Sequence, residues 1–202
     1  MQMTQPMPGS PAFLCCVSSI QWLPEAPISV LPLSCGLRDR VGLFCASVEA
    51  GVLEAYRGDD YLSMMAQVLS DRLAEATVEK MHLEVRRHFW GYAPHEHLTM
   101  EQLHREEYQG IRPAVGYPSL PDVSVNFELD QLLTMSQIGI RLTESGMMMP
   151  HSSVSGLMFA HPQAHYFDLG KIDEEQLRDY ARRRGIPVEL MRRYLQSSLI
   201  KK

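Results

Sequence analysis

The stretch of this chain with the clearest chemical potential is residues 110–119, which read GIRPAVGYPS. Its two prolines fix φ and remove two backbone N–H donors, while its two glycines permit conformations that other residues avoid. The segment predicts a shaped loop, neither a helix nor a central strand, whose backbone groups are free to meet a ligand. Arg112 adds one permanent cation. The composition alone fits a rigid connector equally well, since Pro and Gly punctuate most loops.

Other residue types that often carry chemistry form no recognisable site in this sequence. His95 and His97 flank an acidic residue, and His161 and His165 are four apart. Neither pair is in a predicted long helix that would put both imidazoles on one face, so zinc binding is not predicted. No Ser-His-Asp or Cys-His arrangement has a supporting local motif. The sequence therefore predicts no metal site and no catalytic residue on this chain.

A buried strand and a long helix are predicted ahead of the loop. Residues 40–48, RVGLFCASV, read as the strand. Asp59 or Asp60 caps a helix that runs to about Phe89, before a glycine and a proline. The apolar residues that recur in it at helical spacing are Leu62, Met65, Ala66, Leu69, Leu73 and Ala76.

Further strands are predicted at 138–142, where apolar and polar residues alternate, and at 153–160 and 165–170. Start signals indicate further helices at Thr99 with Gln102, at Asp122 or Ser124, at Asp173 with Gln176, and over residues 188–196. Gly185 ends the helix that Asp173 begins. A long helix, several shorter helices and short strands predict an α+β fold with an antiparallel sheet.

Charge and hydropathy exclude two classes of partner. A net charge of −5 and a pI near 5.9 argue against nucleic-acid binding, and no apolar run reaches the length of a membrane span. Residues 171–202 hold nine Lys/Arg and five Asp/Glu, so they carry about +4 and leave −9 on residues 1–170. The basic end is either a docking face for an acidic partner or a solvated helix face.

Residues 1–36 differ from the rest of the chain. They hold six of the thirteen prolines, three of the four cysteines and one charged residue, Glu25. Their short apolar runs predict edge strands or an irregular wrap without a long helix. We therefore divide the chain into a divergent Pro-rich segment, 1–36, and one domain, 37–202. The cysteines show no CxxC spacing, and a reducing cytosol fits them best.

The pattern Arg-x-x-x-Gly-Tyr within GIRPAVGYP resembles the S-adenosylmethionine-binding motif of the activation domain of cobalamin-dependent methionine synthase. Residues 59–113 are similar to the family's long helix and the approach to its binding loop. Residues 138–195 are similar to its strand pair and closing helices. The resemblance runs in the family's order over about residues 38–196.

The resemblance implies a set of ligand-contacting residues: Arg112, Ala114, Gly116, Tyr117, Tyr166, Phe167, Glu106 and Glu75. Arg112 would meet the carboxylate of S-adenosylmethionine, and Tyr117 would pack on the adenine or brace the loop. From the residues alone, Tyr166 reads as a half-buried strand aromatic and Glu75 as a residue on the polar face of a helix.

The resemblance also implies a function. We expect a stand-alone, amino-terminally shortened activation domain that binds S-adenosylmethionine in the cytoplasm. Cobalamin would be carried only by a separate methionine synthase polypeptide, with a flavodoxin-type protein as reductant, and no nucleic acid or membrane would take part. The family's His-Thr-Glu-Lys is replaced here by residues 123–126, VSVN, and the family's ligand-contacting amino-terminal aspartate has no counterpart. The alternative is an interaction module or truncated product that binds the ligand weakly or not at all.

Overall fold

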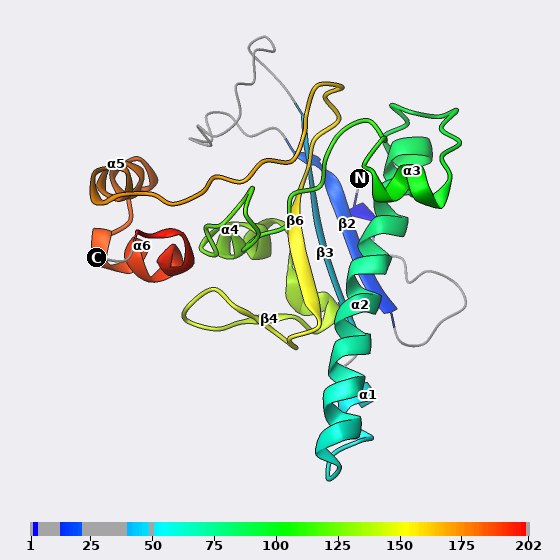
Figure 1. Cartoon of the computed structure of the whole chain (residues 1–202), viewed down its shortest axis with the longest axis horizontal. Helices are drawn as coiled ribbons and strands as arrows, with labels where there is room; N and C mark the ends of the chain where they lie inside the picture. Colours follow the sequence, from blue (N-terminus) through cyan, green and yellow to red (C-terminus); the bar gives the residue numbers. More distant parts are fainter. Residues whose placement is uncertain (1, 4–12, 22–39, 49–50, 201–202) are drawn as a thin grey trace.

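The computed structural model describes residues 2–3, 13–21, 40–48 and 51–200. Its central sheet is antiparallel, in the order β1 (Gln2–Met3), β2 (Phe13–Gln21), β3 (Val41–Val48) and β6 (Ser153–Met158) (Figure 1). The predicted strands at 40–48 and 153–160 are confirmed, and so is the α+β class. The predicted boundary between residues 36 and 37 lies outside the described residues.

Helices and two short strands surround this sheet. They are α1 (Gly51–Glu54), α2 (Asp60–Glu84) with a π-helical turn Val85–Phe89, α3 (Met100–His104), α4 (Val125–Leu133), a 3₁₀ turn Met135–Ile138, β4 (Arg141–Leu142), β5 (Met148–Met149), α5 (Glu174–Arg184), α6 (Val188–Tyr194) and a 3₁₀ turn Gln196–Ser198. None of the helices in the described ranges has the length and apolar character of a transmembrane span.

Both faces of the sheet are covered. Successive side chains of β3 point to opposite faces and therefore enter two different cores. Leu43 and Cys45 pack into a core with α4, whereas Phe44 and Ala46 pack with the carboxyl-terminal half of α2. This explains why the strand is apolar without alternation. A third, smaller core joins α5 and α6 and reaches α4 through Phe127.

The long helix begins where its capping residue predicts. The Asp59 side chain accepts a hydrogen bond from the Leu62 N–H at 3.0 Å, and the helical run continues through Phe89. The buried face of α2 is not the face that carries the large apolar residues predicted at helical spacing. Ala66, Ser70 and Ala74 are buried, whereas Leu62, Leu69 and Leu73 are exposed.

Local start and stop signals are the best-predicted features. Both capping boxes form, at Thr99 with Gln102 and at Asp173 with Gln176. Gly185 ends α5 in the left-handed conformation, at φ 64°. Each of these signals depends only on residues close in the sequence, which is why the sequence reveals them.

Two predicted strands are wrong. Residues 138–142 contain the end of a 3₁₀ turn and the two-residue β4, because Gly139 adopts a left-handed φ of 78° that breaks the alternation. Residues 165–170 form an irregular extended segment that lies against the loop at 117–119. The helix predicted from Asp122 or Ser124 does form, but Ser124 makes no side-chain capping bond, and the Asp122 carboxylate accepts from the Ser124 N–H instead.

Candidate functional site

The loop at 110–119 is held against β6 by backbone hydrogen bonds. Ile111 exchanges two bonds with Phe159, each 2.9 Å, and the Val115 N–H donates to the Ser155 carbonyl at 2.9 Å. The Pro113 carbonyl accepts from the Leu157 N–H at 3.0 Å. The loop backbone is therefore less free than the sequence suggested, since Ile111, Pro113 and Val115 use backbone groups to pair with β6 and with Phe159 directly after it.

Close backbone approach requires glycine at two positions of this pairing. A Cβ on Gly156 would lie 2.3 Å from the Pro113 carbonyl oxygen, and a Cβ on Gly110 would lie 2.3 Å from the Phe159 carbonyl oxygen. Gly110 also has a φ of 82°, which other residues avoid. These glycines let the loop lie directly on β6, with Arg112 and Ala114 on its other side.

Arg112 is the centre of the polar contacts. Its backbone N–H donates to the Tyr166 hydroxyl at 2.9 Å, and its Nη2 donates to Glu79 Oε1 at 2.8 Å. Its Nε is buried and has no hydrogen-bond partner among the described residues. Burial disfavours the charged guanidinium, but Tyr166 and Glu79 outweigh that effect, so the pKa of Arg112 is raised above its ordinary value. The charge is therefore permanent.

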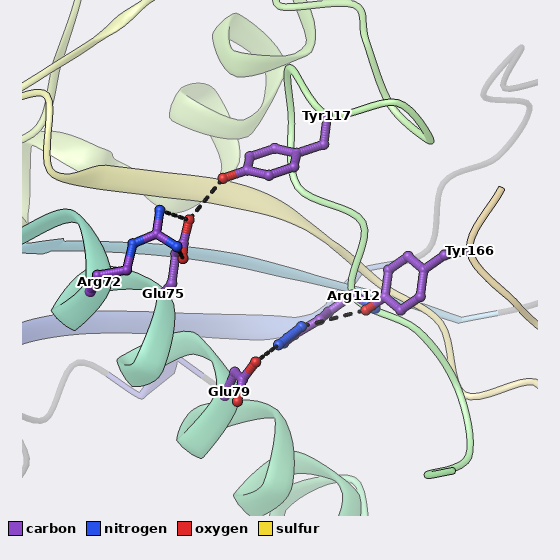
Figure 2. Close-up of polar contacts among 6 residues, drawn as sticks. All are labelled: Arg72, Glu75, Glu79, Arg112, Tyr117 and Tyr166. Carbon is purple, nitrogen blue, oxygen red and sulfur yellow. Dashed lines mark hydrogen bonds and ion pairs between the residues drawn. The ribbon is translucent and has the colours of Figure 1, made fainter. Parts of the chain in front are cut away.

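Helix α2 presents three charged side chains to this loop. Arg72, Glu75 and Glu79 are three and four residues apart, so they share one face of the helix. Glu75 pairs with Arg72 at 2.8 Å and accepts from the Tyr117 hydroxyl at 3.1 Å. Figure 2 shows the two resulting rows of contacts, Arg72–Glu75–Tyr117 and Glu79–Arg112–Tyr166. Burial and the bond to Glu75 raise the pKa of Tyr117.

The extended segment after β6 closes the other side of the site. The Ser119 hydroxyl donates to the Phe167 carbonyl at 2.5 Å and accepts from the Phe167 N–H at 3.1 Å. The Leu169 N–H donates to the Pro118 carbonyl at 3.3 Å. These bonds fix Tyr166 and Phe167 beside the loop although they are not in a strand.

Together these elements enclose a groove of about 740 Å³, a volume in the range of small-molecule sites. Its apolar lining is formed by Phe44, Val78, Pro113, Ala114, Pro118, Val154 and Phe167. Its charged lining is formed by Arg72, Glu75, Glu79, Glu106, Arg112 and Asp168. Four carboxylates against two guanidinium groups leave an excess of two negative charges. Such a groove suits a ligand with an apolar body, a carboxylate and at least one positive charge.

The structure brings most of the predicted ligand-contacting residues to this groove. Those that line it are Arg112, Ala114, Tyr117, Tyr166, Phe167, Glu106 and Glu75. Gly116 does not line it: it is exposed, and its left-handed φ of 89° forms the turn that carries Tyr117. The part these residues take in binding stays a prediction.

Sequence reasoning missed several lining residues, of which Glu79 and Asp168 are the charged acceptors. The four-residue spacing of Glu75 and Glu79 on a predicted helix was the available signal for Glu79. Glu106 carries a further signal that only the structure shows. It has a left-handed φ of 57°, a conformation uncommon outside glycine that often marks functional sites.

Comparison with known proteins identifies the fold. Residues 29–185 match the family described as vitamin B12 dependent methionine synthase, activation domain. The chain belongs to this family. The activation-domain fold is also supported by a solved structure, the crystal structure of the MetH reactivation domain bound to AdoHcy. The two share 41% sequence identity with a TM-score of 0.75, over 83% of this chain and 53% of that chain.

Two consequences follow for the activation-domain assignment. The family resemblance drawn from the Arg-x-x-x-Gly-Tyr motif and its flanks is confirmed, and so is the fold it implied. This chain spans about half the length of the solved domain that it matches. The activity, ligands and partners of the longer protein are therefore treated below as proposals for this chain.

Proposed function

We propose that this chain binds S-adenosylmethionine in the groove between α2, the loop at 110–119 and the segment at 166–168. One observation carries the proposal: a single groove combines an apolar lining, the guanidinium of Arg112 and an excess of carboxylates. The choice of ligand is supported by the 41% identical MetH reactivation domain, which was crystallised bound to AdoHcy.

The chemistry of the ligand matches the groove. The amino-acid end of S-adenosylmethionine carries a carboxylate and an ammonium, and its sulfonium adds a second positive charge. Arg112 would bind the carboxylate, because a fixed guanidinium suits that geometry. Glu75 and Glu106 would stabilise the positive charges. Ala114 lines the groove together with Phe44 and Val154, and its small side chain would leave room for the flat adenine.

The proposed activity is to position a methyl group for a partner. Cobalamin would be held by a separate methionine synthase polypeptide, and one electron from a flavodoxin-type donor would accompany the transfer of the methyl from the sulfonium sulfur to cobalt, leaving S-adenosylhomocysteine in the groove. This chain would contribute proximity and orientation, which by themselves can supply several kcal/mol of a barrier. It would act in methionine biosynthesis in the cytoplasm.

Calorimetric titration of the chain with S-adenosylmethionine tests the binding step. Arg112→Ala should weaken binding by about 10- to 100-fold, because it removes charge-assisted hydrogen bonds worth about 1.5–3 kcal/mol. Arg178→Ala is the matched control, since Arg178 is exposed on α5 and does not line the groove. Circular dichroism checks that both variants fold.

The outcome that would contradict the proposal is the absence of binding by the unmodified chain up to millimolar ligand. That result would favour an interaction module that keeps the fold without the ligand. The transfer step is tested separately, by mixing the chain with a cobalamin-loaded synthase polypeptide and a one-electron donor and following the cobalamin spectrum.

A further inference from the structure

One contact of the groove stands where the proposed ligand would bind. Glu79 Oε1 accepts from Arg112 Nη2 at 2.8 Å, while Arg112 Nη1 faces the Tyr166 hydroxyl at 3.5 Å. The outer edge of the guanidinium, which a carboxylate would bind with two parallel bonds, is thus divided between a helix side chain and a tyrosine (Figure 2). A ligand carboxylate that approached this edge would therefore compete with Glu79 for Nη2.

The two partners of this ion pair differ in their freedom to move. The Arg112 side chain is 17% exposed, and its backbone is fixed by Tyr166 and sits between residues paired with β6. The Glu79 side chain is 57% exposed. Glu79 can therefore turn into solvent, and the ion pair with so exposed a carboxylate is weak.

We propose that Glu79 competes with the ligand carboxylate for Arg112 and so sets the affinity and selectivity of the groove. This inference rests on the proposed function. With no ligand, Glu79 neutralises the buried guanidinium. A ligand with a carboxylate would compete with Glu79 for Nη2 of Arg112, whereas a ligand without one would leave the ion pair intact.

The groove offers matched variants that separate competition from general electrostatics. Glu79→Gln removes the charge but keeps an acceptor, and Glu79→Ala removes both. Asp168→Asn removes another lining carboxylate, whose Oδ1 accepts from the Gly170 N–H. Glu84→Gln removes a carboxylate of α2 that pairs with Lys80 and does not line the groove.

The test is calorimetric titration of each variant of the whole chain with two probes, S-adenosylmethionine and its decarboxylated analogue. The probes share the sulfonium and the adenosine but differ in the carboxylate. Both Glu79 variants should bind S-adenosylmethionine about two- to fivefold more tightly, the range that an exposed ion pair allows. They should bind the decarboxylated analogue with equal or lower affinity, because the groove has lost a negative charge. Asp168→Asn and Glu84→Gln should tighten neither probe.

Each outcome decides between the two proposals. Unchanged or weaker binding of S-adenosylmethionine by the Glu79 variants overturns the competition. Equal tightening of both probes, or tightening by Asp168→Asn, also overturns it, because the effect would then be one of net charge. Binding of S-adenosylmethionine by the Glu79 variants but not by the unmodified chain would contradict the proposed function of the unmodified chain, while supporting Glu79 as the competitor for Arg112. If no variant binds either probe, the proposed function fails and the competition fails with it.

Discussion

The two ends of α2 have similar residue types and opposite environments. At the carboxyl-terminal end, Val78, Met81 and Val85 are buried against β3 and β6. At the amino-terminal end, Tyr61 and Met64 are exposed, and the first turns of the helix extend past the strands beside α1 in Figure 1. The difference shows that contact with the sheet, and not the hydrophobicity of the residues, decides which part of this helix is buried. We call the buried, carboxyl-terminal part the fixed end. Glu75 and Glu79 lie towards the fixed end, where they can be held at the groove.

The largest difference between the two ends should come from their ion pairs. Arg86 and Glu96 form a buried bidentate pair, with bonds of 2.7 and 2.6 Å, and Arg86 also lies 4.4 Å from the ring centre of Tyr108. Glu96→Gln should lower the free energy of unfolding by about 3–5 kcal/mol, because it leaves a buried charge unpaired. Denaturant titration measures this.

The matched control is the exposed ion pair at the other end, just before α2. Arg57 and Glu54 lie 3.3 Å apart with both side chains largely exposed, so Glu54→Gln should cost less than about 1 kcal/mol. Equal losses of unfolding free energy in Glu96→Gln and Glu54→Gln would contradict this difference between the two ends.

A pair of methionines makes the same comparison without charge. Met81 is 7% exposed and Met64 is 56% exposed. Met81→Ala should lower the free energy of unfolding by about 2–5 kcal/mol through lost burial and a residual cavity. Met64→Ala should change it by about 0.5 kcal/mol or less. A large loss in Met64→Ala, measured by the same titration, would show that the amino-terminal end is covered after all.

The smallest effect is a pH dependence confined to the fixed end, since residues 60–81 contain no histidine. Burial, then the positive charges of Arg86 and Arg112, lower the pKa of His82 from 6.5 to about 2. Because the folded pKa lies below the unfolded value, the stability contributed by neutral His82 is full above pH 6.5 and falls as the pH drops towards 2. Between pH 7 and pH 5 the loss should be about 1–2 kcal/mol.

Comparison of the unmodified chain with His82→Gln isolates this contribution. The variant should lose less stability between pH 7 and pH 5, when unfolding is followed at both pH values. Equal losses of unfolding free energy in the two proteins would mean that His82 takes up a proton in the folded state as readily as in the unfolded state.

Features that depend on nearby residues could be predicted from the sequence, and features that depend on contact with the sheet could not. The caps at Asp59, Thr99 and Asp173 were predictable because each depends on residues within one turn. The loop was predictable because its motif is local too, and the family because similar segments follow in the same order over about residues 38–196. The exposed face of α2 was not, since Leu62 and Leu69 have the spacing of a buried stripe and only the reach of the sheet decides otherwise.

The groove shows the same limit. Arg112 and Tyr117 could be predicted as site residues, but Glu79 is 33 residues before Arg112 and its pairing depends on how α2 crosses the loop. The sequence predicts a strand over residues 165–170, around Tyr166. The real partners of this segment are Arg112 and, through Ser119, the loop, and no periodicity within residues 165–170 could show that.

The pairing of the loop with β6 has a consequence for hydrogen exchange. The amides of Ile111 and Val115 donate to the carbonyls of Phe159 and Ser155, and the amides of Leu157 and Phe159 donate back to loop carbonyls. Loops normally exchange their amide protons quickly through small local openings. Here the amides of the loop and of β6 should exchange slowly and together, in the same opening event. The segment that looks most like a loop in the sequence would then belong kinetically to the core of the protein.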